Sequence, residues 1–179
     1  MASYIIRKAG PDDCESIVPL INELAAYLRM QDQVEMTADK LRGDAFCEHP
    51  FVHLLVAESS VTKEILAYTS FSYTYSSWKG RTVYLDDLYV TPRHRGAGLG
   101  TSLMQAVAKT AVAQGCSRMN WIVFAWNERP RALYTRLGGE NLTEKEDFHN
   151  ITLFKEQLYD FAHSYVVKVG ENTKLDVRL

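Results

Sequence analysis

A glycine-rich loop with basic flanking residues stands near the middle of the chain, between a strand-like run and the start of a helix. Glycine recurs at positions 96, 98 and 100, and Arg93, His94 and Arg95 precede it. Such a loop can direct several backbone N–H groups at a pyrophosphate, and the helix dipole adds attraction for the anion. The spacing therefore predicts a site for the phosphates of an anionic cofactor.

Two other phosphate-binding patterns do not match this loop. A nucleoside triphosphate loop requires Lys after its last glycine, whereas Thr101 follows Gly100. A dinucleotide fingerprint, Gly-x-Gly-x-x-Gly, would need its third glycine at Thr101. The pattern that remains is Arg-Gly-x-Gly-x-Gly. A glycine-rich turn that only caps the helix is the structural alternative, but the preceding strand and the basic flank favour cofactor binding.

Two adjacent acids, Asp86 and Asp87, stand in the strand-like run 84–90 that leads into the loop. Neighbouring side chains point to opposite faces of a regular strand, so these two share a site only through a bulge or at an opening of the sheet. Buried carboxylates without partners are costly, and the structural alternative places one or both at a strand end facing water. The sequence leaves both arrangements open.

The elements that must position these residues alternate between strand and helix patterns. Alternating or continuous apolar runs predict strands at residues 4–9, 51–58, 65–75, 82–90, 119–125 and 152–155. Helical spacing predicts helices over residues 17–27, after Thr37, over 103–112, over 130–137 and before Phe161. Pro19 should bend the first helix or divide it into two. The three middle strands should form a meander before the loop.

Composition excludes several classes of protein. The 179 residues are 46% hydrophobic and 23% charged, which suits one globular domain. The net charge of -2 argues against a nucleic-acid binder, and a small cationic substrate fits better. Three widely spaced cysteines favour reduced thiols in the cytoplasm, and the histidines lack metal-binding spacing, so no metal is expected. No signal or membrane segment is evident, so no membrane partner is expected.

The sequence resembles the GNAT superfamily of N-acetyltransferases through Arg95–Gly100, which is similar to the superfamily's acetyl-CoA signature. The resemblance extends to the diamine acetyltransferase family, closer to its thialysine branch than to its polyamine branch, and covers roughly residues 3–162. The residues that carry it are Asp13-Cys14, 21–27, 48–51, 55–58, 78–81, 84–90, 126–128 and Leu133-Tyr134.

This resemblance implies an α/β (α+β) GNAT fold: a mixed central sheet of about six to seven strands, with helices on both faces and a V-shaped opening. It implies a single domain over residues 1–163, followed by a tail, 164–179, that is flexible or adds a strand. It also implies acetyl-CoA as cofactor. The expected cofactor contacts are Leu88, Tyr89, Val90, Arg95, Gly96, Ala97, Gly98, Leu99, Gly100, Thr101, Asn127 and Tyr134.

Amine acetylation needs two further groups. An amine with a pKa of about 10.4 is protonated near neutral pH and requires a base, and the departing thiolate is helped by an acid. The resemblance implies Tyr134 as the acid, although an aromatic residue on a core face is the structural alternative. Asp86 stands where the family carries a glutamate, and a water could bridge the shorter side chain to the amine.

The expected substrate contacts are Tyr27, Trp78, Asp86, Asp87 and Glu146. A solvated loop charge is the alternative for Glu146, and a hairpin core position is the alternative for Trp78. Leu28 stands where the relatives carry a glutamate, and Ser76 where the polyamine enzyme has an aspartate. Fewer carboxylates attract a multiply charged amine less, which favours a smaller substrate.

The sequence thus predicts a cytoplasmic, acetyl-CoA-dependent N-acetyltransferase that transfers the acetyl group directly to a primary amine of a small molecule such as thialysine, a diamine or a polyamine-like compound. The resemblance also implies a homodimer. Two alternatives stay open. One is acetylation of protein lysines or N-termini, and the other is a catalytically silent acyl-CoA-binding module.

Overall fold

A mixed five-stranded sheet forms the centre of the first of two structural units in the computed structural model, which describes residues 4–146 and 151–164. The strands lie in chain order, β1 (Tyr4–Lys8), β2 (His53–Ser59), β3 (Ile65–Ser76), β4 (Gly80–Val90) and β5 (Met119–Asn120). The first four are antiparallel to their neighbours, and β5 runs parallel to β4. The predicted meander of three middle strands is therefore confirmed.

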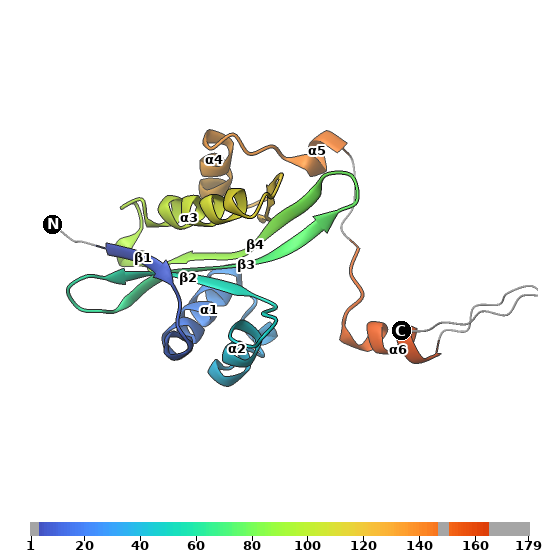
Figure 1. Cartoon of the computed structure of the whole chain (residues 1–179), viewed down its shortest axis with the longest axis horizontal. Helices are drawn as coiled ribbons and strands as arrows, with labels where there is room; N and C mark the ends of the chain where they lie inside the picture. Colours follow the sequence, from blue (N-terminus) through green and yellow to red (C-terminus); the bar gives the residue numbers. More distant parts are fainter. Residues whose placement is uncertain (1–3, 147–150, 165–179) are drawn as a thin grey trace, which may run out of the picture. The chain divides into compact units, whose positions relative to one another are not determined.

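Helices cover both faces of this sheet, as predicted (Figure 1). Two of them, α1 (Cys14–Leu28) and α2 (Ala38–Ala45), lie on one face, and α3 (Leu99–Ala113) lies on the other. Short 3₁₀ turns, η1 (Pro11–Asp13), η2 (Gln31–Gln33) and η3 (Pro92–His94), connect the elements. Pro19 does not divide α1, which runs unbroken through it. Thr37 caps α2 by accepting a hydrogen bond from the Lys40 N–H at 3.3 Å.

The main core lies between the sheet and α1 and α2. Its buried side chains come from both helices and three strands: Cys14, Ile17, Leu20, Leu41, Ala45, Leu54, Val56, Ile65, Tyr68 and Tyr89. On the opposite face, α3 buries Leu99, Leu103, Met104, Val107 and Ala111. Burial of apolar side chains of this size stabilises the fold by roughly 1.5–3 kcal/mol each. The sheet is thereby held rigid on both faces around β4.

The sheet has fewer strands than the six to seven predicted. The apolar run 119–125 pairs with β4 only at Met119 and Asn120. Further along this run, Ile122 and Phe124 are exposed, and no described strand pairs with them, so it is not buried on both faces as its composition suggested. Residues 152–154 likewise form no strand, and a helix begins at Lys155.

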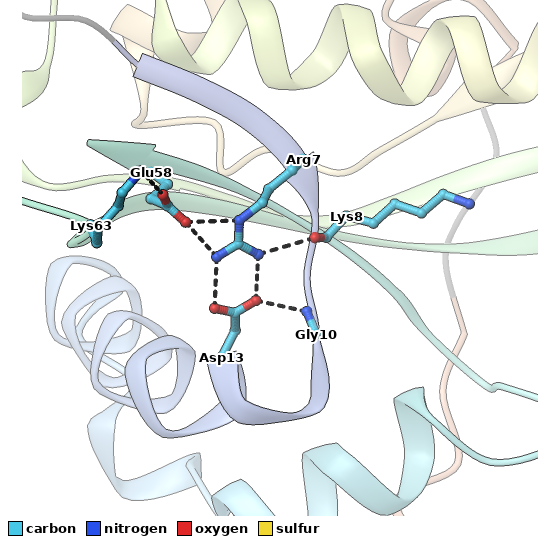
Figure 2. A network of polar contacts seen from close by, with 6 residues as sticks. All are labelled: Arg7, Lys8, Gly10, Asp13, Glu58 and Lys63. Carbon is cyan, nitrogen blue, oxygen red and sulfur yellow. Dashed lines mark hydrogen bonds and ion pairs between the residues drawn. The ribbon is translucent and has the colours of Figure 1, made fainter. Parts of the chain in front are cut away.

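An ionic network ties β1 to the segment that follows it in the chain and to β2, its partner in the sheet (Figure 2). The Arg7 guanidinium donates two hydrogen bonds to Asp13, at 2.6 and 2.9 Å, and one from Nε to Glu58 at 2.8 Å. The second carboxylate oxygen of Glu58 pairs with Lys63 at 3.4 Å, and Asp13 also accepts from the Gly10 N–H. The Arg7 hydrogen bonds lower the pKa of the Asp13 carboxyl. This network joins β1 to the start of α1 and the end of β2.

The second unit begins at Ala125 and contains α4 (Glu128–Arg136), α5 (Leu142–Glu146) and α6 (Lys155–Ser164). Arg131 of α4 pairs with Glu144 of α5 at 3.6 Å and donates a hydrogen bond to the Ala125 carbonyl. The predicted helix before Phe161 is α6, which continues to Ser164. The rest of the predicted tail, 165–179, lies outside the described residues, and the prediction of one domain over 1–163 stays a prediction.

Candidate active site

Strand β4 contains a β-bulge at the two adjacent acids. Asp87 stands opposite Ser70 of β3, whereas the next pair joins Leu85 to Phe71. Asp86 is therefore the extra residue, and its insertion breaks the alternation of the strand. The bulge is one of the two arrangements that would allow Asp86 and Asp87 to share a site.

Three consecutive side chains of β3 bind three different polar groups of Asp87. The Tyr68 hydroxyl donates to the Asp87 carboxylate at 2.9 Å, and the Thr69 hydroxyl donates to its carbonyl at 2.6 Å. The Asp87 N–H donates to the Ser70 hydroxyl oxygen at 3.1 Å. All three β3 residues are buried. Asp87 is therefore held on its side chain and on both of its backbone groups.

The carboxyl groups of Asp86 and Asp87 both have a higher pKa than a free aspartate. Burial and the neighbouring Asp86 charge raise the pKa of Asp87 to about 6, although hydrogen bonds from Tyr68 and at Ser70 act in the opposite direction. Asp86 is exposed as a residue, yet the surrounding protein partly desolvates its carboxyl group and raises its pKa. Within the described chain, neither carboxylate forms an ion pair with Lys, Arg or His. The bulge is thus a locally uncompensated acidic position, which suits a cationic ligand.

Beyond the bulge, β4 has one unpaired edge within the first unit. Leu88, Tyr89 and Val90 are paired with β3 on one side. On the other side, pairing with β5 involves Val83 and Tyr84 and goes no further in the described chain. Backbone N–H and C=O groups on an unpaired edge are available to an extended ligand that adds to the sheet. The resemblance to the GNAT superfamily implies that the sheet opens here and that the extended part of acetyl-CoA lies in the opening.

The glycine loop leads from β4 into α3 in the conformation that its glycines permit. Gly96 and Gly98 have backbone φ values of 85° and 83°, which residues other than glycine rarely adopt. Gly98 is the N-cap residue of α3. The helix ladder begins with the Ser102 N–H bonded to the Gly98 carbonyl at 2.9 Å. The N–H groups of residues 99–101 precede that bond and have no partner within the helix. They are the donors that a pyrophosphate would need.

Gly100 lies where the helix meets the strand. A Cβ atom built there would lie 3.7 Å from Val90 Cγ2 and 3.8 Å from Leu88 Cδ2, which is ordinary contact distance. The first turn of α3 therefore packs directly on the part of β4 that is expected to hold the cofactor. Arg95 is fixed at the start of the loop, because its Nε donates to the Val90 carbonyl at 2.9 Å.

Comparison with known proteins identifies the family. The model of the acetyltransferase (GNAT) family matches residues 17–139, which include the bulge, the glycine loop and α4. The chain belongs to this family. It is accordingly an acetyltransferase, and the predicted GNAT fold is confirmed. The match continues across the boundary between the two structural units at residues 124 and 125.

Curated relatives and solved structures agree with this assignment. Thialysine N-epsilon-acetyltransferase of Bos taurus is 41% identical over 168 residues, covering 90% of this chain and 99% of that protein. Spermidine/spermine N(1)-acetyltransferase-like protein 1 of Homo sapiens is 33% identical over 90% of this chain, which matches 24% of that longer protein.

Among solved structures, an integron cassette protein of V. cholerae has a TM-score of 0.74 at 22% identity, covering 92% of this chain and all of its own. An aminoglycoside N-acetyltransferase in complex with CoA has a TM-score of 0.63 at 16% identity, covering 87% of this chain and 95% of its own. Both likenesses concern the fold. The GNAT acetyltransferases as a family use acetyl-CoA, and this second structure contains CoA.

Two predicted residues of the acetyltransferase site, Asn127 and Tyr134, belong to the second unit. Asn127 is buried and is the N-cap residue of α4, although its side chain makes no capping hydrogen bond. Tyr134 lies within α4 and is half-buried, and burial raises the pKa of its hydroxyl. The predictions that both contact the cofactor stay predictions.

The remaining predicted substrate residues lie apart along the chain. Trp78 occupies the β3–β4 turn and is 91% exposed, so the alternative of a hairpin core position is wrong. Glu146 ends α5 and is exposed. Tyr27 lies near the end of α1, where its ring faces Arg95. Their roles toward an amine stay predictions.

Sequence reasoning missed the residues of β3 that hold Asp87. Their signal was present, because Tyr68, Thr69 and Ser70 place three hydroxyl groups in succession between the apolar residues 65–67 and Phe71. No group of three or more His, Cys, Asp or Glu side chains suited to a metal ion occurs among residues 4–146 and 151–164. In the same part of the chain, the helices fall short of the length and apolarity that crossing a bilayer demands.

Proposed function

We propose that this acetyltransferase uses acetyl-CoA to acetylate a primary amine of a small molecule, by direct transfer, and that the Asp86–Asp87 bulge receives the amine. The observation that carries the proposal is the pair of carboxylates at this bulge. Both are partly desolvated and without an ion-pair partner in the described chain. A protonated amine would supply the missing charge.

Asp86 is the proposed proton acceptor. The amine must lose its proton before it can attack a carbonyl carbon, because its free pKa is about 10.4. Desolvation raises the pKa of Asp86, which makes this carboxylate a stronger base than a free aspartate. Since Asp86 has no hydrogen bond within the described chain that would occupy its oxygens, it can accept the proton directly or through one water.

The proposed cofactor site follows β4 into α3. Bound acetyl-CoA would supply the thioester whose acetyl group is transferred. The N–H groups of Leu99, Gly100 and Thr101 at the start of α3 fit its phosphates, as do the exposed residues Gly96, Ala97 and Gly98. The edge of β4 at Leu88, Tyr89 and Val90 has no neighbouring strand in the described chain and fits the extended arm, although Arg95 already occupies the Val90 carbonyl. An N–H near Leu88 would face the carbonyl oxygen of the thioester. Asn127 is proposed as a further contact.

Tyr134 is the proposed acid for the departing thiolate. Burial raises the pKa of its hydroxyl, so the proton is retained well above neutral pH and can be donated when the thiolate leaves. A covalent cysteine relay is not part of the proposal. Cys14 is fully buried in the main core, and burial raises the pKa of its thiol, so it has neither the access nor the thiolate form of a nucleophile.

Thialysine or a short diamine is the proposed substrate class. The 41% identical relative carries thialysine in its name, and Leu28 and Ser76 leave fewer carboxylates for a polyamine with several charges. A panel of thialysine, lysine, diamines, polyamines and lysine peptides, with CoA release as the signal, tests this. Highest kcat/KM for a small amine supports the proposal. Higher turnover of peptides would indicate a protein acetyltransferase, and cofactor binding with no turnover would indicate a silent binding module.

A cytoplasmic homodimer built from one domain per chain completes the proposal. The family match supports one domain, since it covers parts of both units. Exposed aromatic side chains at Tyr75 and Trp78 offer apolar surface of the kind that subunit interfaces cover. The three free cysteines suit a reducing compartment. Sedimentation equilibrium of the purified chain would measure the oligomeric state, and a monomer at micromolar concentration would contradict the homodimer.

A further inference from the structure

Tyr68 has a hydroxyl group that the core itself does not require. The residue is fully buried between the sheet and α1, among apolar neighbours such as Ile17 and Val56. A phenylalanine would fill nearly the same volume without a polar atom to satisfy. Among the residues that the structure describes, this hydroxyl makes one hydrogen bond, the 2.9 Å bond to Asp87.

The Tyr68 hydroxyl is the donor in this hydrogen bond when Asp87 is ionised. Burial, together with the charges of Asp87 and Asp86, raises the pKa of Tyr68 far above that of a free tyrosine. The hydroxyl therefore keeps its proton, and it donates to Asp87 whenever Asp87 is ionised, because a carboxylate can only accept. A permanent donor favours the ionised form of the carboxyl group that it contacts.

The two residues that follow Tyr68 in β3 hold the backbone of Asp87. Thr69 and Ser70 bind the carbonyl and the N–H of Asp87, so the backbone at the bulge is held as firmly as the side chain. The acid pair thus divides into a fixed member, Asp87, and a member without hydrogen-bond partners in the described chain, Asp86. A bulge re-aims the side chain of its extra residue, which here is Asp86.

We propose that Tyr68 is a positioning residue of the acetyltransferase reaction: its buried hydroxyl keeps Asp87 oriented and ionised, so that Asp87 holds the cationic amine while Asp86 accepts its proton. This inference rests on the proposed function, because it assigns a task to the same acid pair. It differs from a purely structural role for Tyr68 in one measurable respect, the dependence of the effect on pH.

The charged and titratable groups around Asp87 set that dependence. On β4 these are Asp86, Tyr84 and Tyr89, and on β3 Tyr68 faces Asp87 directly. From α1, Glu23 accepts a hydrogen bond from the Tyr89 hydroxyl at 2.8 Å. From the start of the glycine loop, Arg95 lies over the Tyr89 ring. Burial and the Asp86 charge raise the pKa of Asp87 to about 6, so its ionisation falls near neutral pH.

The test compares Tyr68→Phe with Tyr73→Phe in the full chain. Tyr73 lies on the same strand with its ring against His53 and Phe71, and its variant loses a hydroxyl remote from Asp87. NMR titration of the Asp87 carboxyl carbon should show its pKa rising in Tyr68→Phe by roughly half a unit to one unit, the size expected for one hydrogen bond. Tyr73→Phe should leave that pKa unchanged.

The pH profile of kcat/KM for the best amine is the second readout. In Tyr68→Phe the acid limb of the profile should move to higher pH by as much as the pKa of Asp87 rises. The KM for the amine should be raised several-fold at pH 6.5 and should return largely to the wild-type value at pH 8.5. Recovery is expected because Asp87 ionises at high pH even without its donor. A double variant with Asp87→Asn should lose little more than Asp87→Asn alone, since Tyr68 acts through Asp87.

The outcomes are distinct. A loss in Tyr68→Phe that is equal at every pH, or that adds fully to Asp87→Asn, would overturn the inference while leaving the proposed function intact. An unchanged Asp87 titration in Tyr68→Phe would also overturn it. If the wild-type chain acetylates no amine, the proposed function fails, and the positioning role in catalysis fails with it. Should Tyr68→Phe not fold, additivity is tested with Thr69→Val, which removes the neighbouring donor to Asp87.

Discussion

The guanidinium group of Arg95 lies over the ring of Tyr27, 5.3 Å from its centroid, and 5.4 Å from the centroid of the Tyr89 ring. Arg95 opens the glycine loop, whereas Tyr27 lies in the last turn of α1. Tyr89 is in turn hydrogen-bonded to Glu23 of α1. The start of the glycine loop is therefore held against α1, which lies on the face of the sheet opposite α3.

Replacing Tyr27 with alanine should weaken cofactor binding. The ring stabilises the position of Arg95 by about 0.5–1 kcal/mol, so the Kd for CoA should rise about two- to fivefold. Tyr27→Phe retains the aromatic face and serves as the control. Calorimetric titration of CoA into each variant measures the effect. An unchanged Kd combined with a raised KM for the amine would instead place Tyr27 among the substrate contacts, as the sequence predicted.

Asp86→Asn should reduce kcat/KM for the best amine by about 10²–10⁴-fold, because it removes the proposed proton acceptor and keeps the shape of the side chain. Asp86→Glu should retain most of the activity, since it keeps the carboxylate on a longer arm. Asp12→Asn, an exposed acid in the η1 turn, controls for a general loss of negative charge. Equal activity of the Asp86→Asn and Asp12→Asn variants would exclude Asp86 as the base.

Tyr134→Phe should lower kcat on the order of 10²-fold with little change in the Kd for CoA, because the hydroxyl acts when the thiolate leaves. Burial raises the pKa of Tyr134, so the wild-type enzyme should keep its acid at alkaline pH, beyond the ordinary pKa of tyrosine. Stopped-flow measurement of CoA release tests both points. Tyr75→Phe, which alters an exposed tyrosine of β3, is the control, and a Tyr134→Phe variant as active as this control would contradict the assignment.

Stability should depend on pH through Asp87. Its pKa is raised from 3.8 to about 6 in the folded chain, so the stability that this group contributes is fully present below pH 3.8 and is lost as the pH rises through 6. The asparagine in the Asp87→Asn variant does not ionise, so this position then contributes no pH dependence. Between pH 4 and pH 8 the variant should therefore gain about 2 kcal/mol in free energy of unfolding relative to the wild type. Urea unfolding at both pH values measures this, and a constant difference would show that Asp87 titrates normally.

Two glycine-to-alanine substitutions should have opposite effects. Gly98→Ala places a side chain at a φ of 83° and should cost about 1–2 kcal/mol in free energy of unfolding, and it should weaken CoA binding as well. Gly43 lies within α2 with open space around its Cβ position, so Gly43→Ala should stabilise the chain by about 0.5–1 kcal/mol and leave CoA binding unchanged. Thermal unfolding without CoA measures the stability of each variant, and the shift in Tm on adding CoA measures its cofactor binding.

Local chemistry made several parts of the structure predictable. Thr37 caps α2 because its hydroxyl suits an N-cap, and α3 begins at the glycine loop because Gly98 tolerates a left-handed conformation. The apolar run 119–125 was misjudged, since composition alone does not reveal whether a neighbouring strand is present. The residues at the end of the run remain partly exposed, and the sheet is accordingly one or two strands smaller than predicted.

The sequence by itself determined the family, through its motifs, and an acid pair beside a glycine loop that starts a helix, because loop conformation and helix capping depend on residues close together in the chain. Only the tertiary structure decided how the pair is arranged. The register between β3 and β4 depends on packing between distant segments, and it places Asp86 in a bulge and brings Tyr68, Thr69 and Ser70 against Asp87. No local pattern around residue 87 specifies partners that lie 17 to 19 residues away.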